Sequence, residues 1–186
     1  MLKPTLWRTC RVLANPKRLL LLYDVANSPS GLTVGEAARR ARVSLPVASQ
    51  YLRALGARGL LAARRSGPRV RYIASANPTV AGAAELLRGI TATPASSATI
   101  IRAVTAFTHP RRIELVQCLS DDWRPVATLR RQTRISKAAL KRHLAKLEHR
   151  GLVERDSQRR VRCRRPSDGF LRTLLTLARA SVVTPP

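Results

Sequence analysis

The 186-residue chain contains the same sequence pattern twice, and this internal repeat constrains its fold more than any other feature. Pro16-Lys17-Arg18-Leu19 recurs 94 residues later as Pro110-Arg111-Arg112-Ile113, and Arg58-Gly59-Leu60-Leu61 recurs 92 residues later as Arg150-Gly151-Leu152-Val153. The two-residue difference falls in the turn-rich stretch Ser28-Pro29-Ser30-Gly31, where a deletion costs little. The repeat predicts two tandem domains of one fold, with residues 1–91 as the first domain, 92–98 as a linker and 99–186 as the second.

Each copy predicts the same order of elements. Pro16 suits the first turn of a helix, Ser44 suits a helix N-cap, and Gly59 suits the position just past a helix end. In the first copy we expect helices over residues 5–13, 16–26, 34–40 and 45–58, strands over 60–64 and 69–73, and a closing helix over 80–90. In the second copy we expect helices over 99–107, 110–119, 126–132 and 137–150, a hairpin over 152–164 and a closing helix over 169–180.

The charge of the chain indicates a polyanionic partner. Lys and Arg number 35 against 10 Asp and Glu, which gives a formal net charge of +25, and both halves of the chain are basic. Hydrophobic residues make up 45%, which excludes a disordered basic tail, and an aromatic content of 4% argues against a base-stacking platform for single strands. No apolar run approaches the roughly 20 residues that a membrane span needs. We therefore expect no membrane association and a cytoplasmic, nucleoid-associated protein.

The predicted order of helix, turn, helix, glycine and basic hairpin is typical of a winged helix-turn-helix. In that fold the third helix packs at a steep angle on the fourth and presents it to the major groove of DNA, while the hairpin wing lies alongside. The fold class expected is therefore mainly α with small β-hairpin wings, built as two tandem winged helix-turn-helix domains.

Two stretches in each copy resemble sequences of the ArsR/SmtB family of bacterial regulators. The stretch from Val43-Ser44-Leu45-Pro46 to Gly59-Leu60-Leu61 resembles the recognition helix and wing entry of that family, and the stretch from Ile135-Ser136-Lys137-Ala138 to Gly151-Leu152-Val153 resembles it again. Leu13-Ala14-Asn15-Pro16 and Phe107-Thr108-His109-Pro110 are similar to the opening of the family's second helix. The resemblance covers most of each copy and implies a transcriptional regulator, with repression as the expected direction of control.

The chain departs from the family in two ways. Metal-sensing members carry a Cys-x-Cys pair on the third helix, and the aligned positions here are Thr33 and Gly35, then Pro125 and Ala127. None of these side chains offers a thiolate, so we expect no metal. Family members usually hold one such unit and work as homodimers, whereas this chain holds two. We therefore expect a monomeric pseudo-dimer whose first and closing helices form the seam, with a homodimer as the other possibility.

The expected DNA-binding residues lie on the fourth helices and the wings. The first recognition helix offers Leu45, Pro46, Val47, Ser49 and Gln50, and the second offers Ser136, Lys137, Ala138, Lys141 and Arg142. Gln50 could pair with adenine, Arg142 with guanine, and Val47 could meet a thymine methyl group. The wings offer Arg64, Arg65, Arg69 and Arg71, then Arg159, Arg160 and Arg162, for phosphate or the minor groove. Arg39, Arg40, Arg130 and Arg131 on the third helices fit either a phosphate contact or a solvated face.

Other function classes find less support in the sequence. The chain has no phosphate-cradling glycine loop and no GxSxG or HExxH motif, so we expect neither an enzyme nor a cofactor. Its three cysteines are far apart, and no small-molecule effector can be identified. Double-stranded DNA is the expected partner. An architectural or replication-associated DNA-binding protein of low specificity, a protein-interaction module and a structured-RNA binder remain alternatives, because fold alone does not fix function.

Overall fold

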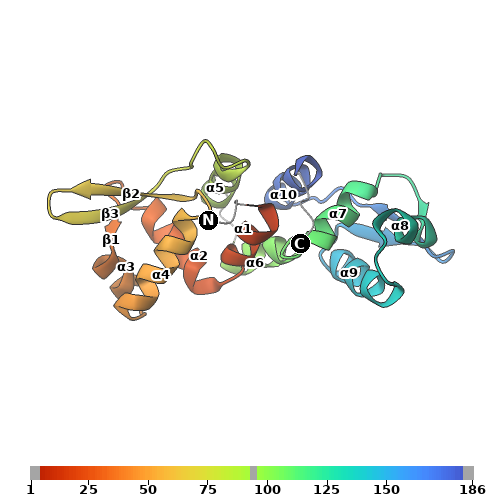
Figure 1. Ribbon diagram of the computed structural model, residues 1–186, viewed down its shortest axis with the longest axis horizontal. Coiled ribbons are helices and arrows are strands. Elements are labelled where there is room, and N and C mark those ends of the chain that lie inside the picture. Colours follow the sequence, from red (N-terminus) through yellow and green to blue (C-terminus); the bar gives the residue numbers. More distant parts are fainter. Residues whose placement is uncertain (1–4, 93–95, 182–186) are drawn as a thin grey trace.

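The computed structural model describes residues 5–92 and 96–181, and these form two units with the same element order (Figure 1). The first unit comprises α1 (Leu6–Leu13), α2 (Pro16–Ala26), β1 (Leu32–Thr33), α3 (Val34–Ala41), α4 (Leu45–Gly56), β2 (Leu61–Ser66), β3 (Arg69–Ala74) and α5 (Ala83–Ala92). The second comprises α6 (Ser97–Thr105), α7 (Pro110–Cys118), β4 (Arg124–Pro125), α8 (Val126–Thr133), α9 (Lys137–His149), β5 (Val153–Arg155), β6 (Arg160–Cys163) and α10 (Gly169–Ala180). Both units have the element order of a winged helix-turn-helix, which confirms the expected fold class. Part of the predicted linker, residues 93–95, lies outside the described residues.

Local hydrogen bonds explain where several helices begin. Asn15 precedes Pro16 and its side chain accepts a hydrogen bond from the Arg18 backbone N–H at 3.0 Å. His109 does the same before α7, accepting from the Arg111 N–H at 3.1 Å. Thr33 and Glu36 form a reciprocal capping box at α3. The prolines and caps fix the second helix of each unit at the predicted residue.

Each wing is a three-stranded antiparallel sheet, where the sequence predicted only a two-stranded hairpin. The strand orders are β1-β3-β2 and β4-β6-β5. Leu32 pairs with Tyr72 in the first sheet, and Arg124 pairs with Val161 in the second. The added strands are two residues long and enter from the segment before α3 or α8. Strands this short show no alternation of polar and apolar residues, so the pattern gave no sign of them.

One expected helix start was wrong, and one expected N-cap residue lacks its hydrogen bond. The closing helix of the first unit begins at Ala83 and not at residue 80, because the chain first turns through Gly82, whose φ of +77° lies in the left-handed region. Ser44 occupies the N-cap position of α4, but its side chain makes no capping hydrogen bond. Pro46 at the helix start has no N–H to donate. The equivalent Ser136 does cap α9, at 3.4 Å from the Ala139 N–H.

The first and closing helices of the two units meet in the middle of the molecule (Figure 1). Helix α1 packs on α6, and α5 packs on α10, so equivalent helices pair across the two units. A Cβ atom at Gly89 would lie 2.9 Å from Cδ2 of Phe170, and one at Gly82 would lie 3.0 Å from Leu177. The buried side chains form one continuous apolar cluster through both units. The four helices that the sequence placed at the seam are therefore in contact there.

Within residues 5–92 and 96–181, no helix has the length and apolar character that a membrane span requires. The same residues contain no group of three His, Cys, Asp or Glu side chains that could hold a metal ion.

Candidate nucleic-acid interface

The two recognition helices bury one face and leave the other to solvent. Helix α3 packs on α4. The buried residues of the two recognition helices are Ala48, Leu52 and Leu55 in α4, then Leu140, Leu144 and Leu147 in α9. The ten candidate reading residues all lie at the other side or at the helix start, and each is exposed or half-buried. The structure therefore leaves every one of them accessible to a ligand, and base contact by each stays a prediction.

An arginine in a left-handed conformation occupies the turn before each recognition helix. Arg42 has a φ of 51° and Arg134 a φ of 52°, at matching positions of the repeat. Residues other than glycine rarely adopt this conformation, because the Cβ atom crowds the following carbonyl. Within the described residues, Arg159 at the tip of the second wing, with a φ of 58°, is the one further non-glycine case. All three strained residues are thus arginines on the candidate DNA face.

The turn forms an equivalent surface hollow in both units. In the first unit the hollow has a volume of about 550 Å³, and in the second about 560 Å³. The lining residues correspond through the repeat: Gly35, Ala38, Arg39, Arg42, Val43, Ser44 and Leu45 in the first, then Ala127, Arg130, Arg131, Arg134, Ile135 and Ser136 in the second. No acidic residue lines either hollow.

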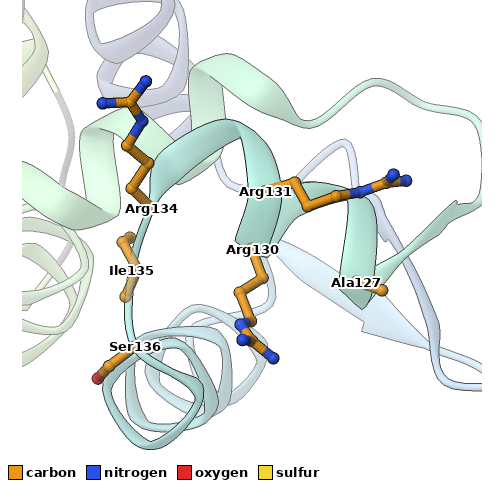
Figure 2. Close-up of a pocket in the computed structure, with 6 residues that line it drawn as sticks. All are labelled: Ala127, Arg130, Arg131, Arg134, Ile135 and Ser136. Carbon is orange, nitrogen blue, oxygen red and sulfur yellow. The ribbon is translucent and has the colours of Figure 1, made fainter.

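The arginines of the second hollow diverge (Figure 2). The side chain of Arg130 extends toward α9, that of Arg131 extends outward from α8, and that of Arg134 points away from Ser136. Guanidinium groups that converge on one point suit a single small anion, whereas groups that spread suit charges strung along a chain. The hollow therefore fits successive phosphates of a nucleic-acid backbone better than one compact anion.

Sequence reasoning missed Arg42 and Arg134 as candidate site residues. They occupy equivalent positions in the repeat, 92 residues apart. A helix-turn-helix turn often contains glycine, and a basic residue there in both copies was the signal available. The same hollows include Arg39, Arg130 and Arg131, which the sequence left open between phosphate contact and a solvated face.

A second, larger groove joins the recognition helix of the second unit to its wing. It has a volume of about 640 Å³ and an apolar floor that includes Leu140 and Leu144. Its cationic lining residues come from α8, α9 and the wing: Arg130, Lys137, Lys141, Arg155 and Arg159. No acid lines this groove. Lys137, Lys141 and Arg159, which the sequence assigned separately to helix and wing, are therefore brought together on one surface.

The wing arginines divide into two groups. Arg64, Arg65 and Arg69 are exposed and carry no ion pair in the part of the chain that the structure describes, and the same holds for Arg159. Arg71 instead donates to the carbonyl oxygens of Ser30 and Gly31, at 2.8 and 2.9 Å, and lies 3.4 Å from Glu36. It anchors β3 to the segment before α3.

Arg160 and Arg162 also have partners within the protein. Arg160 pairs with Asp156 at 2.6 Å, and Arg162 pairs with Glu154 at 2.7 Å. Both guanidinium groups lie over the ring of Trp123, at 5.9 and 4.6 Å from its centroid. Phosphate contact by these two residues and by Arg71 stays a prediction, while the structure gives each a role in holding its wing.

The inner side of each recognition helix carries a ring at the same repeat position. Arg18 lies 5.0 Å over the Tyr51 ring, and the His143 ring lies 4.6 Å from that of His109. Burial, followed by the neighbouring His109 and Arg112, lowers the pKa of His143 to about 4. Tyr51 and His143 are half-buried, and their rings pack beneath the helix. At neutral pH, His143 therefore adds no charge to the DNA face.

One comparison with known proteins finds a match, and it covers the central region of the second unit. A family model described as a helix-turn-helix domain matches residues 107–156, which run from just after α6 through α7, α8 and α9 to just past β5. No curated protein and no solved structure gives a match to the chain. The helix-turn-helix domain indicates a DNA-binding protein and makes transcription regulation plausible.

Proposed function

We propose that the chain is a transcriptional regulator that binds duplex DNA sequence-specifically, without enzymatic activity, and that it represses its targets. The observation that carries this proposal is the equivalent pair of acid-free hollows at the two helix-turn-helix turns, each holding an arginine in a left-handed conformation. Strain of this kind persists where the surroundings maintain it, and it concentrates at functional sites. The helix-turn-helix match over residues 107–156 supports DNA as the ligand.

The two units act as a covalent pseudo-dimer in this proposal. The pairing of α1 with α6 and of α5 with α10 corresponds to the isologous contacts of a symmetric dimer, in which equivalent surfaces meet. We propose that the two recognition helices address successive major grooves on one DNA face, about 34 Å or one helical turn apart. The resemblance to a family of homodimeric regulators favours the same arrangement.

Different chemistry at the starts of the two recognition helices supports an asymmetric binding site. In α4, Leu45 exposes 58% of its surface and is followed by Pro46 and Val47. In the first half of α9 the exposed cationic residues are Lys137, Lys141 and Arg142. An apolar helix start suits thymine methyl groups, whereas lysine and arginine suit the acceptors of guanine. We therefore propose that the first half-site is richer in A·T pairs than the second.

The test is selection from a random duplex library by the full chain, at about 150 mM salt with excess competitor DNA. A bipartite motif with unequal half-sites about 10 bp apart is the expected result. Strong binding without any enriched motif would contradict sequence-specific regulation and favour the alternative function, an architectural DNA-binding protein. A perfect palindrome would contradict the pseudo-dimer and favour equivalent half-sites from two chains.

A matched pair of variants on one helix sharpens the selection. Arg142→Gln should relax the preference at one base pair of the second half-site, because a bidentate arginine contact discriminates by about 1–3 kcal/mol. Lys146→Gln removes the same charge further along α9, outside the candidate site, and should leave the motif unchanged. If both variants broaden the motif equally, Arg142 contributes charge alone. Repression is tested separately by placing the selected site over a reporter promoter.

A further inference from the structure

A charged cleft lies in the second unit, away from the candidate DNA face. It has a volume of about 450 Å³, and it is formed by α6, the end of α9 and the segment that joins β6 to α10. Arg102, Arg150, Arg164 and Arg165 line it, and Asp168 is the acid among its lining residues. Helix α9 has 13 residues, so the cleft at its end lies about 20 Å from Lys137 at its start. A ligand here would not overlap with DNA at the start of the helix.

The protein balances the positive charge of this cleft only in part. The side chains of Arg150 and Arg165 have no ion pair and no hydrogen-bonded partner within residues 5–92 and 96–181. Arg164 forms an ion pair with Glu154 at 3.5 Å. Asp168 uses its carboxylate to cap α10, accepting from the Leu171 N–H at 2.6 Å. Arg102 donates to the carbonyl oxygen of His149 at 3.2 Å, so the guanidinium groups of Arg150 and Arg165 are the two that lack a partner among the described residues.

The first unit holds equivalents of three of these side chains, and some of their buried polar atoms lack a hydrogen-bond partner among the described residues. Thr99, Arg102 and Arg150 correspond through the repeat to Thr5, Arg8 and Arg58. Among the residues that the structure describes, the buried Nε and Nη1 atoms of Arg58 have no acceptor, and the buried hydroxyl of Thr5 has no partner. Buried donors without acceptors are costly and need an explanation, which an anion supplies. In the second unit the equivalent side chains line an open cleft, and Arg164 and Arg165 add to its positive charge.

We propose that the cleft of the second unit binds a small molecule carrying at least two phosphate groups. Arginine forks match phosphate oxygens, and the volume lies in the range of small-ligand pockets. The ligand would brace α6, α9 and α10 together. Because α6 and α10 are also the helices that meet α1 and α5, its binding would shift one recognition helix relative to the other. This second step rests on the proposed regulatory function, whereas the binding step does not.

Calorimetric titration of the full chain with inorganic pyrophosphate, at about 150 mM salt and without DNA, tests the binding step. Saturable binding at one site per chain is expected. Arg150→Gln/Arg165→Gln should weaken it at least about 10-fold, the loss that follows removal of charge-assisted hydrogen bonds. Arg39→Gln/Arg131→Gln removes the same charge from the turn hollows and should change it less than about twofold. Equal losses in both variants, or no saturable binding, would overturn the proposal.

Circular dichroism melts establish that the variants fold. If Arg150→Gln/Arg165→Gln does not, Arg164→Gln/Arg165→Gln replaces it, because both side chains are exposed. The regulatory step is tested by measuring DNA affinity with and without saturating pyrophosphate. An affinity change in the wild type that disappears in Arg150→Gln/Arg165→Gln is expected. An equal change in both would mean that pyrophosphate competes with DNA for the DNA face, which would overturn the regulatory step alone.

Discussion

Replacing both left-handed arginines with glycine should stabilise the protein while weakening its DNA binding. A left-handed conformation costs an L-residue about 1–2 kcal/mol, which glycine does not incur. Each glycine also lowers the free energy of unfolding by about 0.4–1 kcal/mol, because it gives the unfolded chain more conformational freedom. The side chains of Arg42 and Arg134 make no hydrogen bond or ion pair among the described residues, so their removal breaks no such contact. Arg42→Gly/Arg134→Gly should therefore gain about 1.6 kcal/mol in all, or about 3–6 °C in Tm.

The effect on DNA binding has the opposite sign. Each phosphate contact contributes about −0.9 to the slope of log K against log salt concentration, so losing two should make the slope shallower by about 1.8. Fluorescence anisotropy with the selected duplex over a salt series measures the slope, and scanning calorimetry measures Tm. Arg42→Lys/Arg134→Lys retains both the charge and the strained backbone and serves as the control for each assay.

Two outcomes would refute this reasoning. An unchanged slope in Arg42→Gly/Arg134→Gly would show that the guanidinium groups do not meet phosphates. A lower Tm than that of the lysine control would show that the left-handed turn is not a source of strain, since the lysine variant keeps the backbone penalty that glycine removes.

Three other predictions concern the seam between the units, the second wing and the second recognition helix. Phe170→Ala should destabilise the protein by about 3–5 kcal/mol in chemical unfolding, because it empties the buried contact with α5 at the seam. Glu154→Gln should tighten DNA binding up to about fivefold at low salt, because it releases the wing residue Arg162 from an exposed ion pair. The pKa of His143 is lowered in the folded state, so its contribution to stability is complete above the ordinary pKa of about 6.5 and is lost as pH falls toward 4. The acid decline of Tm should be smaller in His143→Gln, and an equal decline in both proteins would contradict the role of burial.

The sequence predicted the fold well where local chemistry decides it. Prolines at the first positions of α2 and α7 fix the start of each helix, and the internal repeat is enough by itself to align the two units. The partners of the wing arginines were not predictable, because they depend on tertiary contacts. Glu36 lies 35 residues before Arg71 in the chain, and only the folded sheet brings them within 3.4 Å. A count of basic residues therefore overstated the charge that each wing leaves free for a ligand.

The pairing of α1 with α6 and of α5 with α10 occurs within a single chain. Two separate subunits would have to find each other, and at low abundance they would dissociate, so their occupancy of DNA would rise sigmoidally with total protein. Here the partner is always present at an effective concentration that dilution does not alter. In the proposed pseudo-dimer, a cell holding only a few copies would therefore retain the assembled form, and DNA occupancy would follow protein level in a simple hyperbolic manner.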